Sequence, residues 1–176
     1  MKIHLSKKYW ILLVAGLLIA LSAVASYFLF FKSSEPDIHY HAGFQVYVND
    51  TLQDFSDLKY MQMKPCGGTF HFEDEQIEKA HLHDAIGDVV HVHREGAVWG
   101  DLFKNIGFEI PASAEFVGYL NGSRQENILT YPILPYDSVV FFSGPIIDMN
   151  RKLQARVTDD HIKEAEARSE NCGDQK

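Results

Sequence analysis

The longest apolar stretch of the chain lies near its N-terminus. Residues 10–31 read WILLVAGLLIALSAVASYFLFF and contain no charged side chain. A helix rises about 1.5 Å per residue, so this stretch is long enough to cross a hydrocarbon core of about 30 Å. Lys7 and Lys8 precede it, and positive charge on this side favours a cytoplasmic N-terminus. The pattern predicts a transmembrane signal-anchor helix at the lipid bilayer.

A cleaved signal peptide is the alternative to an anchor at this place. Residues 23–25 (Ala-Val-Ala) have the small side chains of a cleavage site. Cleavage there would leave the apolar residues 26–31 as a new N-terminus, so we favour the uncleaved anchor. In both cases residues 33–176 are expected to lie outside the cytoplasm.

A strict alternation of apolar and polar positions follows a short polar linker. One side of residues 38–48 is apolar and consists of Ile38, Tyr40, Ala42, Phe44, Val46 and Val48. The other side carries histidine and glutamine and consists of His39, His41, Gln45 and Tyr47. A period of two predicts a strand that is buried on one face only. Residues 49–51 form a turn signal, and a returning strand is expected after it.

The stretch AHLHDAIGDVVHVHREG carries a second alternation, interrupted at Gly87. It predicts a hairpin whose three-residue loop, residues 85–87, places Gly87 in the left-handed conformation. In this register His81 lies opposite His91, and the apolar residues of both strands face the core. The loop length matters, because a four-residue loop would place the two histidine pairs on opposite faces.

The remaining elements predict an α+β fold. Residues 97–108 show apolar side chains at helical spacing, with Gly107 as the C-cap. Strands are expected at 116–120 and 138–142, with a turn at 121–122. Thr158 could N-cap a short helix in the polar tail. One helix packed on a small mixed sheet is a β-grasp-like arrangement, and the strands near the C-terminal end resemble the closing strands of ubiquitin-like sulfur-carrier proteins without their terminal Gly-Gly.

This organisation gives five segments with defined boundaries. They are a cytoplasmic N-terminus at 1–9, the anchor at 10–31, a linker at 32–37, an extracytoplasmic domain at 38–147 and a polar tail with a short helix at 148–176.

Charge and cysteine content narrow the range of partners. Of 16 basic side chains four lie in residues 1–32, whereas all 24 acidic side chains follow. A phosphate backbone would repel such a domain, so nucleic acid is excluded as an expected partner. The cysteines, Cys66 and Cys172, both lie in the exported part, where an oxidising compartment would allow a disulfide between them. A metal-bound or free thiol is the alternative.

Seven of the nine histidines fall between His39 and His93, and six of them form His-x-His pairs. On a strand this spacing places both imidazoles on one face, about 6.5–7 Å apart. Imidazole is a ligand for zinc, copper, nickel and iron(II). We therefore predict a site for a divalent transition metal, most readily zinc or copper. Its expected ligands are His81, His83, His91 and His93, with His39 and His41 as further ligands, His71 as a possible one, and Glu73, Asp74, Glu78 or Asp84 as neighbours in the cluster.

Other interpretations of the histidines are a polar ladder without function, a pH sensor and a small metal-dependent enzyme. Several imidazoles titrating near pH 6.5 could switch a protein–protein interaction. An enzyme would need an open metal position and a cleft. Its signatures are incomplete here, because the pairs match neither the full superoxide dismutase, cupin or metallo-β-lactamase patterns nor a Gly-x-Ser-x-Gly motif. Metal capture, sensing or delivery is favoured over catalysis.

Two motifs resemble those of a family of small, uncharacterised microbial single-pass membrane proteins. The first is HYHAGF, beginning at His39, and the second is HLHDAIGDVVHVHREGAVWGDLFKNIG, beginning at His81. The resemblance covers roughly residues 37–144. It implies an anchored extracytoplasmic domain and carries no established activity with it.

Overall fold

The computed structural model describes residues 7–31, 38–61, 75–111 and 115–169. It divides into two units, residues 1–37 and 38–176. The first contains helix α1 (Lys7–Phe31), whose residues 7–27 have a mean hydropathy of 2.2 and are not buried by the chain. By length and composition α1 could cross a membrane, and a signal sequence would meet the same criterion.

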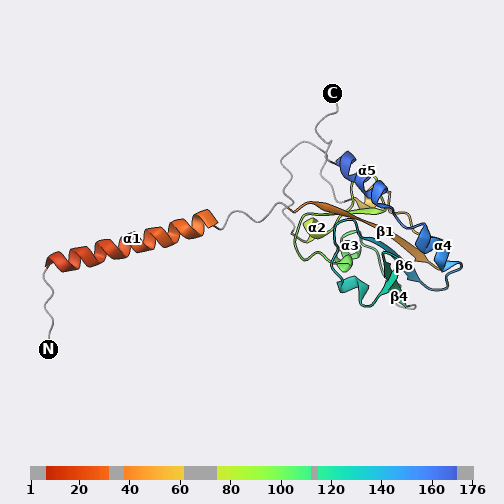
Figure 1. Ribbon diagram of the computed structural model, residues 1–176, viewed down its shortest axis with the longest axis horizontal. Helices are drawn as coiled ribbons and strands as arrows, with labels where there is room; N and C mark the ends of the chain where they lie inside the picture. The colour runs from red at the N-terminus through yellow and green to blue at the C-terminus, as the bar shows by residue number, and fades with distance from the viewer. Residues whose placement is uncertain (1–6, 32–37, 62–74, 112–114, 170–176) are drawn as a thin grey trace, which may run out of the picture. The chain divides into compact units, whose positions relative to one another are not determined.

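The second unit is built around a six-stranded mixed sheet (Figure 1). Its strands follow the order β2-β1-β6-β4-β5, and β3 pairs with β1 beside β2. Strands β1 and β6 are parallel, and the other pairs are antiparallel. The strands are β1 (Tyr40–Val48), β2 (Thr51–Leu52), β3 (Val89–Val92), β4 (Phe116–Leu120), β5 (Ser123–Gln125) and β6 (Ser138–Ser143). The helices of this unit are α2 (Glu75–Lys79), α3 (Trp99–Asn105), α4 (Met149–Gln154) and α5 (Asp159–Ser169), with 3₁₀ turns at Leu58–Tyr60 and Ile128–Thr130.

The main core lies between one face of the sheet and α3. Strand β1 contributes Ala42, Phe44 and Val46 to it, and α3 contributes Trp99 and Leu102, all of them fully buried. These are the apolar positions of the predicted patterns, so the predicted strand faces and the predicted helix are confirmed. The α+β class with a mixed sheet and an N-terminal apolar helix is likewise confirmed.

The turn after His83 differs from the predicted loop. Asp84 and Ala85 adopt the left-handed conformation, with φ of 57° and 55°, and the Ile86 amide donates to the His83 carbonyl at 3.0 Å. Gly87 does not have a positive φ. It is needed for space instead, because a Cβ there would lie 2.3 Å from the Ser56 amide nitrogen. The prediction that Gly87 adopts the left-handed conformation was therefore wrong. The predicted pairing of His81 with His91 is confirmed.

The second face of the sheet is also covered, which corrects the prediction of a half-buried strand at 38–48. Helix α4 packs its Met149 against Val140 and Phe142, and α5 packs Ile162 against Val89. In Figure 1 the blue α5 runs along β1. The polar composition of the C-terminal segment conceals the few apolar residues that make this contact. The histidine face is therefore largely interior.

Candidate metal centre

Three neighbouring segments bring six histidines to the face of the sheet that α5 covers. His41 on β1 pairs with His91 on β3, and His91 pairs on its other side with His81. These three rings form one row across the strands. His39 and His93 form the next row, with ring centroids 4.9 Å apart and planes within 6° of parallel. His83, Nε2 of which contacts His91, completes the cluster.

Two groups within this cluster could hold a metal ion. The outer trio consists of His39, His91 and His93, and the inner trio of His41, His83 and His91. In each trio one ring nitrogen per residue lies within 4.8 Å of the other two. The outer trio reaches the surface through the exposed His39, whereas all three residues of the inner trio are buried. The two trios share His91.

His91 uses both of its ring nitrogens in this arrangement. Its Nε2 contacts Nε2 of His39, and its Nδ1 contacts Nε2 of His83. The His41 and His91 ring centroids are 4.0 Å apart. His91 is only 6% exposed, so it lies at the centre of the cluster.

Backbone and carboxylate oxygens face the Nδ1 atoms of three cluster histidines. Nδ1 of His83 donates to Oδ2 of Asp84 at 2.9 Å, and Nδ1 of His81 donates to the Ile77 carbonyl at 3.1 Å. Nδ1 of His41 lies 3.8 Å from Oε1 of Glu166 on α5. A partner on one nitrogen sets the tautomer and orients the ring, so that the other nitrogen carries the lone pair a metal needs.

Burial keeps the central rings neutral. It lowers the pKa of His41 and of His81 to about 3, and nearby histidines add to both shifts through charge repulsion. The pKa of His91 is also lowered, by burial first and then by its histidine neighbours. Burial lowers the pKa of His83 too, although Asp84 opposes that shift. Neutral imidazole is the metal-binding form.

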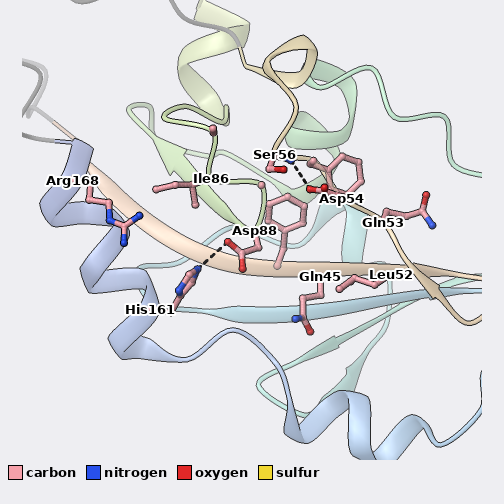
Figure 2. Close-up of a pocket in the computed structure, with 13 residues that line it drawn as sticks. Gln45, Leu52, Gln53, Asp54, Ser56, Ile86, Asp88, His161 and Arg168 are labelled. Carbon is pink, nitrogen blue, oxygen red and sulfur yellow. Dashed lines mark hydrogen bonds and ion pairs between the residues drawn. The ribbon is translucent and has the colours of Figure 1, made fainter.

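Helix α5 covers the face of the sheet that carries the histidine cluster. The Thr158 hydroxyl accepts from the His161 amide at the start of α5, so the predicted N-cap is confirmed. His161 itself pairs with Asp88 at 3.0 Å, linking α5 to the turn before β3 (Figure 2). Gly43 allows the close approach of the preceding segment, because a Cβ there would lie 2.5 Å from Val157.

A pocket of about 410 Å³ lies beside the turn that joins the two histidine pairs (Figure 2). Its lining includes Asp54, Asp88, His161 and Arg168, and none of the six cluster histidines. The cleft beside the metal ligands that the enzyme alternative requires is therefore not supplied by this pocket.

The other expected members of the site have different outcomes. His71, Glu73, Asp74, Cys66 and Cys172 lie outside the described residues. Glu78 pairs with Arg94 at 2.5 Å. His81 lies in the cluster and belongs to neither trio found in the described chain.

Sequence reasoning missed Glu166, which lies near His41 although 125 positions separate the two in the chain. The signal that could have found it is faint. Ile162 and Ala165 are spaced as one face of a helix within an otherwise polar segment, and Glu166 adjoins that face.

We compared the chain with protein-family models, curated proteins and solved structures, and none of them matches. The resemblance seen in the histidine motifs therefore stays a prediction. What is known of the site comes from its own geometry.

Proposed function

We propose that this protein is a membrane-anchored, extracytoplasmic metal-binding protein that captures, senses or delivers a transition metal ion. The observation that carries the proposal is the convergence of ring nitrogens in the outer and inner trios. Histidines separated by up to 54 positions come together there, on three adjacent strand segments.

The donor set favours zinc or copper. All proposed ligand atoms are imidazole nitrogens, which suit these two ions and are poor ligands for magnesium or calcium. The lowered pKa values of His41, His83 and His91 support the proposal, because protons compete less with the metal there. The pKa of about 3 for His41 and for His81 lies below the range of pH 5 to 7 in which the pH-sensing alternative needs imidazoles to titrate. The acidic surface would also attract cations over about 8–10 Å.

The proposed location rests on α1. An uncleaved α1 would hold the chain in the bilayer with residues 1–9 in the cytoplasm, as the lysines before it favour. The fold is proposed to be β-grasp-like, because its parallel pair β1 and β6 lies in the middle of the sheet and α3 packs on one face. Such a fold implies no activity by itself.

Calorimetric titration of the full chain in detergent micelles tests the function directly. We expect Zn²⁺ and Cu²⁺ to bind, and binding to be lost when His81, His83, His91 and His93 are all replaced by alanine. Circular dichroism of that variant checks that the sheet is retained. His161→Ala is the matched control, since His161 lies on α5 outside both trios. Unchanged affinity in the fourfold variant would refute the proposal, as would the absence of binding to the wild-type chain.

Elemental analysis of the chain purified from its native membrane identifies the metal. We expect zinc or copper to copurify with it. A chain that carries neither metal, and that binds neither in titration, would leave metal binding without support.

A further inference from the structure

His91 has a position that no other histidine of the cluster shares. It lies on β3, with His41 on one neighbouring strand and His81 on the other, and it belongs to both trios. Antiparallel neighbours directly opposite one another have Cβ atoms about 4.5–5.5 Å apart, so rings on both sides can reach it. A single metal site would use only one trio, so it would not require a histidine that belongs to both trios.

The two ring nitrogens of His91 lead to different trios. Nε2 contacts His39 of the outer trio, and Nδ1 contacts His83 of the inner trio. The lone-pair directions of the two nitrogens of an imidazole diverge in the plane of the ring. One ion therefore cannot be bound by both nitrogens of the same ring.

We infer that the cluster holds two metal ions that share His91. The outer ion takes Nε2 of His91 with His39 and His93, and the inner ion takes Nδ1 of His91 with His41 and His83. This inference rests on the proposed function and adds to it the number of ions and their bridge. Each ion receives three nitrogen ligands, which for zinc leaves a fourth position for water or another donor.

The proton balance of this arrangement is simple. A neutral imidazole has one lone pair on its ring nitrogens and one N–H, so His91 binds a first ion through its lone pair. Binding of the second ion to the other nitrogen displaces the N–H proton to solvent and leaves an imidazolate between the ions. No electron is transferred, and no other reactant is needed.

The inner trio is suited to hold its ion through the remaining nitrogens. Nδ1 of His83 donates to Asp84, and Nδ1 of His41 faces Glu166 at 3.8 Å. Nε2 of each ring is then the atom directed to the metal, as the contact between Nε2 of His83 and His91 indicates. Carboxylates placed behind histidine ligands also compensate the charge of a buried cation.

Copper(II) loading of the full chain in detergent micelles tests the shared ligand. Copper per chain is measured by mass spectrometry after gel filtration, and paramagnetic resonance counts the spins. We expect two copper ions per chain and a spin count well below two, because an imidazolate bridge couples the two ions. His39→Ala removes a ligand of the outer trio at an exposed position. It is expected to leave one copper ion with a full, uncoupled spin, whereas His161→Ala leaves both the stoichiometry and the coupling unchanged.

The outcomes separate this inference from the function on which it rests. Two copper ions with two uncoupled spins would overturn the bridge, and one copper ion in the wild-type chain would overturn the two-ion site. Either result leaves metal binding intact. A chain that binds no copper and no zinc overturns the proposed function as well. His91→Gln, checked for folding by circular dichroism, is expected to lose the coupling and at least one ion, and retention of two coupled ions would overturn the role of His91.

Discussion

At the scale of single residues, Asp84 joins the turn to the proposed metal site. Its backbone is left-handed with φ of 57°, and its carboxylate accepts from Nδ1 of His83 at 2.9 Å. Asparagine adopts the left-handed conformation at least as readily as aspartate does. Asp84→Asn therefore separates the carboxylate from the turn. We expect it to keep the fold and weaken metal binding about 10–100-fold, as losses of a carboxylate behind a histidine ligand do.

Competition with a chromogenic zinc chelator measures this loss of affinity. Asp88→Asn is the matched control, because Asp88 lies four residues away and pairs with His161 instead of a trio histidine. Equal zinc affinity in wild-type protein and Asp84→Asn would contradict the role given to Asp84. A loss of similar size in Asp88→Asn would show that the effect is one of charge and not of position.

The same turn gives opposite expectations for two neighbouring substitutions. Gly87→Ala places a Cβ 2.3 Å from the Ser56 amide nitrogen, which belongs to the backbone, so the two segments must separate. We expect a loss of about 1–3 kcal/mol in the free energy of unfolding. Ala85→Gly relieves a left-handed residue, and we expect a change between zero and about 1 kcal/mol of stabilisation.

Urea denaturation followed by circular dichroism measures both of these free energies. The opposite signs make each variant the control of the other, since both change the same turn by one methyl group. A Gly87→Ala variant as stable as wild type would mean that the close approach to Ser56 is not maintained in solution.

At the scale of elements, α5 determines how far the histidine face is shielded from solvent. Ile162 is fully buried against Val89, while the rest of α5 is mostly polar. Ile162→Ala removes the largest apolar contact of this helix. We expect it to lower the free energy of unfolding by about 2–3 kcal/mol. We also expect faster chemical modification of the cluster histidines by diethyl pyrocarbonate, because α5 would leave the sheet more often.

Glu164→Ala tests whether that effect depends on the buried face of α5. Glu164 pairs with Arg168 on the exposed side of the helix, and we expect a change below about 0.5 kcal/mol. Modification rates that stay at the wild-type value in Ile162→Ala would show that α5 does not protect the histidines.

The elements differ in how well their sequences predict them. Strand β1 has apolar positions at a period of two, β4 and β6 are short apolar runs that end before a turn or a glycine, and α3 has apolar positions at helical spacing before Gly107. The sequence therefore predicts all four. The packing of α4 and α5 on the second face depends on a few apolar residues contributed by separate segments. No local pattern reports such a contact, and for this reason β1 was expected to be exposed on its histidine face.

At the scale of the whole molecule, the sequence predicts the members of the cluster better than their arrangement. The His-x-His pairs and the parity of the turn place four histidines on one face, and the structure adds the β1 histidines through the pairing of β1 with β3. The shared position of His91 follows from that pairing. It depends on two strand partners that are 50 and 10 residues away, which no local pattern reports.

Burial of so many imidazoles makes the stability of the metal-free protein depend on pH. The pKa of His41 and of His81 is about 3 in the folded chain, against an ordinary value of about 6.5. Between these values the unfolded chain binds protons that the folded chain does not, so the free energy of unfolding falls as the pH is lowered. At pH 5 we expect each of these two rings to lower the free energy of unfolding by about 2 kcal/mol. His83 and His91 act in the same direction.

Urea midpoints of the metal-free chain at pH 7.5, 6 and 5 measure this dependence above the range in which most carboxyl groups titrate. Burial raises the pKa of Asp137, and this shift acts in the opposite direction. His81→Asn removes one of the two rings and is expected to make the dependence shallower. Saturating Zn²⁺ at pH 7.5 is expected to raise the midpoint, because the metal binds only the folded cluster. A midpoint that stays constant from pH 7.5 to 5 would show that the rings are not buried as neutral imidazoles.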